Sequence, residues 1–299
     1  MKLNLDHLDG MLKRSQTPTP PHRAPTPPAA GRCGRTVARL NERHVLEAVA
    51  QFGHMRIVEL ARCVWPKARY GEQLARRTVA RLVEQGHLLE RRNALGSTSL
   101  CLTRVGAAWL DARGVTAQHT LDLSSIAGST FFHRTLVTRY LVERLVQGYH
   151  VAGEYQLLQR RTPFPTEQLF KALRKMPDGL VWHRKPGGGV AGVELVEQEA
   201  AAKARPELEK CLRAAEFVGQ PLDAAGAYQV AGLVFVFDRD LNHAKRILLA
   251  ATSRWGSRPQ IERAALERRV KLVSVELRDP LVWVSSSVTT LHDLRQRGV

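Results

Sequence analysis

Residues 73–103 read QLARRTVARLVEQGHLLERRNALGSTSLCLT, and this stretch decides the fold of the N-terminal part. Its first half carries a narrow apolar stripe at helical spacing, formed by Ala75, Val79, Leu82 and Val83. Gly86 then supplies the left-handed stop that commonly ends a helix. Two strand-like runs follow on either side of a Leu-Gly-Ser turn. The stretch therefore predicts a helix followed by a β-hairpin.

Two shorter helical patterns precede it. Apolar residues from Val45 to Phe52 recur at helical spacing and stop at Gly53, and a second run from Ile57 ends before Pro66. After the hairpin, LTRVGAAWLDARG resembles the Leu-Thr-x-x-Gly helix that follows the wing in many bacterial winged-helix proteins. The order of helix, helix, basic helix and hairpin predicts a winged helix-turn-helix over residues 36–115.

The polar side of the third helix and the base of the hairpin are the candidate DNA-binding surface. The residues expected to contact DNA are Gln73, Arg76, Arg77, Arg81, Arg91 and Arg92. A helix fits the major groove, where arginine can bind guanine or phosphate in two places. The alternatives are a simple solvated face, or a winged helix that contacts another protein.

The net charge also favours a polyanionic partner. The chain has 299 residues with 45 Lys and Arg against 28 Asp and Glu, a formal charge of +17. Residues 1–35 contribute +4, residues 36–115 contribute +6 and residues 116–299 contribute +7. Because the excess is spread over all three parts, we interpret it as an extended nucleic-acid footprint, with generic solubility as the alternative.

The hydrophobicity of the chain and its N-terminal residues bear on whether the protein enters a membrane. No apolar run approaches the ~18 residues of a membrane span, and MKLNLDHLDG has aspartates where a signal peptide is apolar. We expect a cytoplasmic protein without membrane insertion.

The four cysteines form no Cys-x-x-Cys motif, so a zinc ribbon or a disulfide framework is not indicated. The Pro/Thr-rich residues 1–35 are expected to form a disordered basic arm.

Residues 116–299 mix helical and strand patterns and predict an α/β domain with a central mixed sheet. Helices are expected over 131–148 and 203–218. One strand is expected to start at residue 151 and to run into a basic loop that ends at residue 161. Further strands are expected over 180–183, 190–198, 228–237, 270–277 and 281–285. The glycines between 180–183 and 190–198 predict that these two strands pair as a hairpin.

Three acids stand out in that hairpin. Asp178 lies in Met-Pro-Asp-Gly before one strand, and Glu197 and Glu199 lie two apart at the end of the other. Side chains two apart in a strand share a face, so the three carboxylates can converge. Carboxylates suit Mg²⁺ or Mn²⁺, and such an ion can assist phosphodiester cleavage while Lys203 contacts the phosphate.

The same acids also fit roles other than catalysis. Acids at strand ends are commonly solvated, and Glu199 with Lys203 can form an i,i+4 pair at a helix start. Glu194 is a weaker substitute ligand, because a regular strand places it on the face opposite Glu197.

The acids carry a resemblance to a known family. Pro-Asp followed by 18 residues and Glu-x-Glu resembles the PD-(D/E)xK motif of restriction-endonuclease-like nucleases, with Glu199 where most members have lysine. A winged helix ahead of VEQEAAAKARPELEK is similar to the plasmid replication-relaxation family and related mobilisation relaxases.

The resemblance implies metal-dependent nicking at a transfer origin during conjugative mobilisation. Asp178, Glu197 and Glu199 would be the catalytic and metal-binding acids, Lys203 a phosphate contact and Glu154 an accessory ligand. Double-stranded DNA would be the partner, with other relaxosome proteins or a coupling ATPase. The commoner relaxase chemistry needs histidines two apart, and no two of the 11 histidines have that spacing. The alternative function is a non-catalytic DNA-binding regulator of plasmid replication or transfer with an inactive nuclease-like domain.

Overall fold

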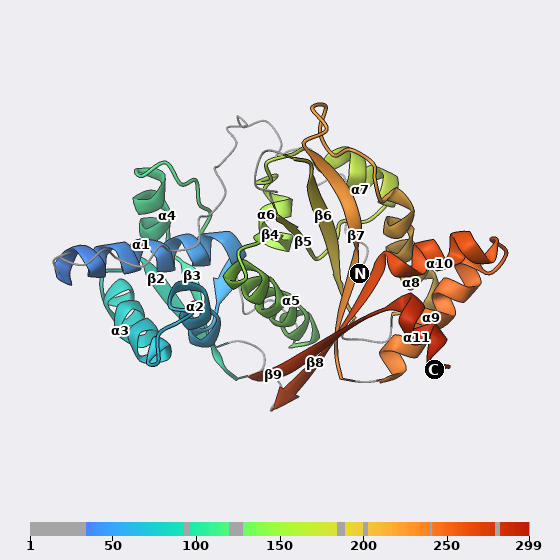
Figure 1. The fold of residues 1–299 in the computed structure, drawn as a ribbon. Coiled ribbons are helices and arrows are strands. Elements are labelled where there is room, and N and C mark those ends of the chain that lie inside the picture. The colour runs from blue at the N-terminus through green and yellow to red at the C-terminus, as the bar shows by residue number, and fades with distance from the viewer. Residues whose placement is uncertain are drawn as a thin grey trace.

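A computed structural model describes residues 34–92, 96–119, 128–183, 189–199, 203–239, 241–278 and 282–298. A helical part with a three-stranded sheet lies on one side of the molecule, and a six-stranded mixed sheet with its own helices lies on the other (Figure 1). The chain is therefore mixed α/β, as expected. Of the expected basic arm, positions 1–33 lie outside the described residues.

The N-terminal part contains the expected helices and hairpin. Its elements are α1 (Gly34–Phe52), β1 (His54–Met55), α2 (Ile57–Val64), α3 (Gly71–Glu84), β2 (Leu88–Arg92), β3 (Thr98–Leu102) and α4 (Arg104–Asp111). The strands are antiparallel in the order β1-β3-β2. Helix α1 begins well before the predicted start because its first turns are largely exposed and so carry no apolar pattern.

The large sheet has the order β4-β5-β6-β7-β8-β9. Its strands are β4 (His150–Gly153), β5 (Gly179–His183), β6 (Ala191–Gln198), β7 (Tyr228–Asp238), β8 (Val270–Arg278) and β9 (Val282–Thr290). Strands β4, β5 and β6 pair antiparallel, β6, β7 and β8 pair parallel, and β9 is antiparallel to β8. The predicted β5–β6 hairpin and the mixed sheet are confirmed.

Helices cover both faces of this sheet (Figure 1). They are α5 (Gly128–Val146), α6 (Glu154–Leu158), α7 (Glu167–Leu173), α8 (Arg205–Leu212), a 3₁₀ turn η3 (Arg213–Phe217), α9 (Leu241–Trp255), α10 (Gln260–Arg268) and α11 (Leu291–Gln296). One core lies between the sheet and α7 to α11. The other joins α5, α1, α2 and valines from the opposite sheet face into one apolar cluster.

Two sequence predictions were wrong in extent. The strand expected from residue 151 ends at Gly153, where pairing with β5 ends, and the chain turns directly into α6. The single helix expected over 203–218 is an α-helix followed by η3. There, the carbonyl of Ala215 accepts a hydrogen bond from Arg269 of a neighbouring segment, so the tertiary contact replaces continued helical bonding. Helices α9 to α11 were not predicted.

No helix of the described part of the chain combines the length and apolar character that crossing a membrane requires. The described cysteines Cys63, Cys101 and Cys211 are all buried free thiols.

Gly53, between α1 and β1, lies against Tyr155 of α6 and provides a test of how the two parts of the molecule pack. Its φ of +77° is left-handed, and a Cβ there would lie 2.8 Å from the Tyr155 ring of α6. Gly86 has a similar φ of +71°, but a Cβ there meets nothing within 4 Å. We expect Gly53→Ala to destabilise the protein by ~1–3 kcal/mol more than Gly86→Ala, because only the first adds a steric clash to backbone strain.

The measurement is urea unfolding of both variants beside the wild type. Equal losses of unfolding free energy would contradict the close contact between Gly53 and Tyr155.

Candidate functional site

The three predicted carboxylates lie at one end of the large sheet. Gly179 of β5 pairs with Val196 of β6, so Asp178 and Glu197 occupy the next facing positions. Glu199 lies just beyond β6, and its N–H donates to the carbonyl of Val236 in β7. Glu197 and Glu199 are both buried. The hairpin register therefore brings together acids that are about 20 positions apart in the chain.

Cationic side chains surround Glu197 and Glu199. The ammonium group of Lys175 bonds a carboxylate oxygen of Glu197. Lys203 Nζ lies 3.6 Å from Glu197 and 3.7 Å from Glu199, and it donates to the carbonyl of Gln198 at 2.6 Å. Arg246 of α9 lies 3.7 Å from Glu199. Lys203, predicted as a phosphate contact, is here part of an ion-pair network.

Asp178 is held by groups from two other elements. The backbone N–H of Gln198 donates to its Oδ2 at 2.7 Å, and His133 Nε2 of α5 lies 3.0 Å from the same oxygen. Burial alone would raise the pKa of Asp178, but the hydrogen bond from His133 and the nearby lysine ammonium groups hold it well below its usual range. Asp178 is therefore an ionised carboxylate at neutral pH.

Burial shifts the other groups of the cluster as well. It raises the pKa of Glu197, against the attraction of Lys175. Burial would lower the pKa of Lys175, but the carboxylate of Glu197 outweighs this and raises it, so the ammonium group stays charged. Cys211 of α8 lies beside this pair, and burial raises its pKa to about 12.

The donor chemistry suits a hard divalent cation, since carboxylate oxygens are the preferred ligands of Mg²⁺ and Mn²⁺. In the described ranges, however, no three His, Cys, Asp or Glu residues are grouped as a metal site. Lys175 takes up an oxygen of Glu197 that such an ion would use. A metal ion would thus have to replace Lys175 at this carboxylate.

A small cavity of about 190 Å³ opens beside Asp178, and both Glu154 and His133 line it. Glu154, the expected accessory ligand, begins α6 and accepts a hydrogen bond from Arg134 of α5 at 2.7 Å. Glu194 pairs instead with Lys271 of β8. The cavity gives solvent a path to Asp178 but not to the carboxylate of Glu199, which is fully buried.

Five of the six residues that were predicted to contact DNA are exposed in the structure. Helix α3 buries Ala75, Val79 and Leu82, while Gln73, Arg76 and Arg77 are exposed. On β2, Arg91 and Arg92 are exposed as well.

Arg81 is less available to a partner than the other basic residues of α3. Its side chain is 42% exposed and pairs with Glu42 of α1 at 3.0 Å, because helix packing brings the two side chains together. Arg76 has only a loose contact to Glu72 at 3.8 Å, and Arg77 has no ion pair within the described residues. Arg77 is therefore the arginine of α3 most available to an anionic partner.

Sequence reasoning missed three cluster residues: His133, Lys175 and Arg246. Lys175 lies three residues before Asp178, so a cation next to the Met-Pro-Asp-Gly turn was a usable signal. His133 and Arg246 reach the cluster from separate helices, and no local pattern marks them. Comparisons with protein-family models, curated proteins and solved structures gave no significant match to the chain.

The Lys175–Glu197 pair can be compared with a surface pair on α8. The side chains of Lys175 and Glu197 are 24% and 4% exposed, whereas those of Lys210 and Glu207 are each 51% exposed. We expect Lys175→Met to cost ~3–5 kcal/mol of unfolding free energy because it leaves the buried carboxylate of Glu197 with only the longer contact to Lys203. Lys210→Met should cost ~1 kcal/mol or less.

A double-mutant cycle with Glu197→Gln, read by urea unfolding, isolates the coupling between the two groups. The combined variant should lose less than the sum of the single losses. Additive losses would show that Lys175 and Glu197 do not interact.

Proposed function

We propose that the protein binds duplex DNA through α3 and the β2–β3 hairpin, and that its carboxylate cluster is a phosphodiester-cleaving centre. The observation that carries the second part is that Asp178 and Glu197 lie directly beyond the last residue pair between β5 and β6, while Lys203 contacts both Glu197 and Glu199. A winged helix followed by a restriction-endonuclease-like domain accounts for both surfaces. The proposed context is a DNA-binding relaxase or relaxosome protein that nicks a plasmid transfer origin.

The exposed side chains of α3 support the DNA-binding part. Gln73, Arg76 and Arg77 lie opposite the buried face, so they can enter a groove without disturbing the core. Arg91 and Arg92 of β2 can follow the adjacent phosphates. The overall charge of +17 adds attraction that does not depend on DNA sequence.

In the cleavage proposal, Asp178, Glu197 and Glu199 are the residues that would hold Mg²⁺ or Mn²⁺. The ion would stabilise charge on the scissile phosphate and lower the pKa of water. Lys175, once released from Glu197, and Lys203 would attract the phosphate to this end of the sheet. His133 would keep Asp178 oriented, because it bonds one oxygen of that carboxylate.

A second function is favoured by a specific observation. Glu197 and Glu199 are neutralised by Lys175, Lys203 and Arg246 of the same chain. Such a closed ion-pair network can hold the sheet end together without any metal ion. The protein would then be a non-catalytic DNA-binding regulator of plasmid replication or transfer.

Cleavage of supercoiled DNA separates the two functions. The substrate is a plasmid that carries the coding region of this protein with its flanking sequences, incubated with Mg²⁺ or Mn²⁺. We expect the wild type to convert it to the nicked form, and Asp178→Asn and Glu197→Gln to lower the rate by about 100-fold or more.

Glu207→Gln is the matched control, since this exposed glutamate of α8 should leave the rate unchanged. Circular dichroism of each variant checks that the fold is kept. A plasmid that stays supercoiled with the wild type would rule out the nicking proposal and leave the regulator.

DNA binding is tested with Arg77→Ala, measured by fluorescence anisotropy on duplex DNA over a range of salt concentrations. Losing one phosphate contact should weaken binding and reduce the slope of log K against log salt by about one. Arg81→Ala should change the slope less, because Arg81 already pairs with Glu42.

Arg268→Ala is the control, since Arg268 is exposed and belongs to α10. Helix α10 lies at the opposite end of the molecule from α3 (Figure 1). If Arg77→Ala binds DNA with the wild-type affinity and salt slope, α3 is not the interface.

A further inference from the structure

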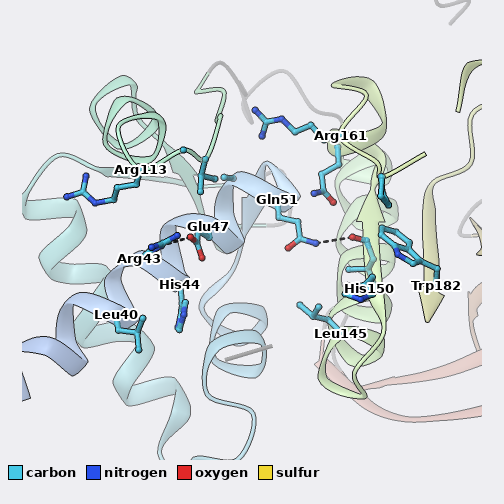
Figure 2. A pocket seen from close by; sticks show the side chains of 16 residues that line it. Leu40, Arg43, His44, Glu47, Gln51, Arg113, Leu145, His150, Arg161 and Trp182 are labelled. Atoms are coloured by element: carbon cyan, nitrogen blue, oxygen red, sulfur yellow. Dashed lines mark hydrogen bonds and ion pairs between the residues drawn. The ribbon is translucent and has the colours of Figure 1, made fainter. Parts of the chain in front are cut away.

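A cavity of about 430 Å³ lies between α1 and the edge of the large sheet, away from the carboxylate cluster. Figure 2 shows α1 on one side and the strand that carries His150 on the other, joined by a hydrogen bond from Gln51. The segment after α4, from Arg113 to Val115, adds a further wall. This volume is within the range of small-molecule binding sites.

The walls of the cavity carry more positive than negative charge. Three arginines line it, Arg43, Arg113 and Arg161, against the single carboxylate of Glu47. Arg43 bonds Glu47 at 2.6 Å, and the Arg113 guanidinium lies over the Trp109 ring, 3.6 Å from its centroid. These two arginines therefore have partners within the protein.

Arg161 is different. It is half-buried, reaches from the sheet side toward α1 in Figure 2, and has no ion pair within the described residues. Burial lowers the pKa of Arg161, and the more distant Tyr155 and Asp111 offset only part of the cost of taking this guanidinium out of water. An anionic group bound in the cavity would offset that cost and could accept two parallel hydrogen bonds from Arg161.

Two residues of the cavity wall, Gln51 and Gln156, have side-chain oxygens that are shielded from solvent and have no hydrogen-bond partner in the described structure. The amide nitrogen of Gln51 donates to the carbonyl of Val151 at 3.1 Å, which fixes the orientation of its oxygen. A buried acceptor without a donor is costly, so a ligand that displaces the groups covering these oxygens and offers them N–H donors would be favoured.

A flat wall completes the site. The His150 ring stacks on Trp182 with centroids 5.8 Å apart and an interplanar angle of 23°. Leu40 and Leu145 add apolar surface to the same cavity. A planar aromatic ring can pack against such a wall, as bases do on aromatic side chains of nucleic-acid-binding proteins.

We propose that this cavity binds a nucleotide, with its base against His150, base N–H groups on the Gln51 and Gln156 oxygens, and its phosphate on Arg161. The same chemistry is offered by a free mononucleotide and by one unit of single-stranded DNA. The site touches both parts of the molecule, so an occupied cavity would add contacts between α1 and the sheet. It needs no metal ion and no cleavage, so it stands apart from the proposed nicking.

Isothermal titration of the full chain in EDTA tests the proposal. The probes are dAMP, dCMP, dGMP, dTMP, a five-residue single-stranded oligonucleotide and inorganic phosphate. At least one nucleotide probe should bind the wild type, and Arg161→Ala should weaken that binding by about tenfold or more through loss of a charge-assisted contact. Arg268→Ala, outside the cavity, should bind as the wild type does.

Gln156→Glu is the second variant, because it keeps the side-chain shape but places a carboxylate in the cavity, which should weaken binding of an anionic ligand. The melting temperature of each variant checks that it is folded. Binding of mononucleotides identifies a free nucleotide as the ligand, and binding of the oligonucleotide alone identifies a DNA strand. The proposal is overturned if no nucleotide probe binds at millimolar concentration, if Arg161→Ala and Gln156→Glu bind like the wild type, or if phosphate binds as tightly as the nucleotides.

Discussion

Helix α5 is buried on two sides, and the rest of the structure depends on that burial. One side packs on α2, where Arg62 bonds Glu143 at 2.8 Å, and the other packs on valines of the large sheet. Burying both sides of one helix joins the N-terminal helices and the sheet into one apolar cluster. The same helix supplies His133 to Asp178 and Arg134 to Glu154. The packing of α5 therefore positions both the helical part and the carboxylate end of the sheet.

Charge compensation is the second constraint on the sheet end. Three carboxylates in or near the core are tolerated because cations from separate elements meet them. Lys175 precedes β5, Lys203 precedes α8 and Arg246 comes from α9. These three cations are matched by the carboxylates of the cluster, so they add nothing to the net charge of +17. The exposed arginines of α3 and β2 form the surface that we propose for DNA binding.

Local sequence patterns predicted helices and strands well where one face of the element is buried and the other is exposed to solvent, or where turn residues mark a hairpin. The alternation of apolar and charged residues on α3 and the turn glycines of the β5–β6 hairpin are of this kind, and both elements are present. The same hairpin logic placed Asp178 beside Glu197. Prediction failed where tertiary contacts replaced local bonding, as at η3, and where solvent-exposed turns carry no apolar period, as at the start of α1.

The sequence by itself determined the helices and hairpin of the N-terminal part, the mixed sheet and the position of Asp178 next to Glu197, because periodicity and turn chemistry act over a few residues. Only the tertiary structure decided which cations reach these carboxylates, that Arg81 is paired with Glu42, and that a cavity with an unpaired Arg161 lies between α1 and the sheet. These features join residues far apart in the chain. Their distances are set by how helices and strands pack, which no local pattern encodes.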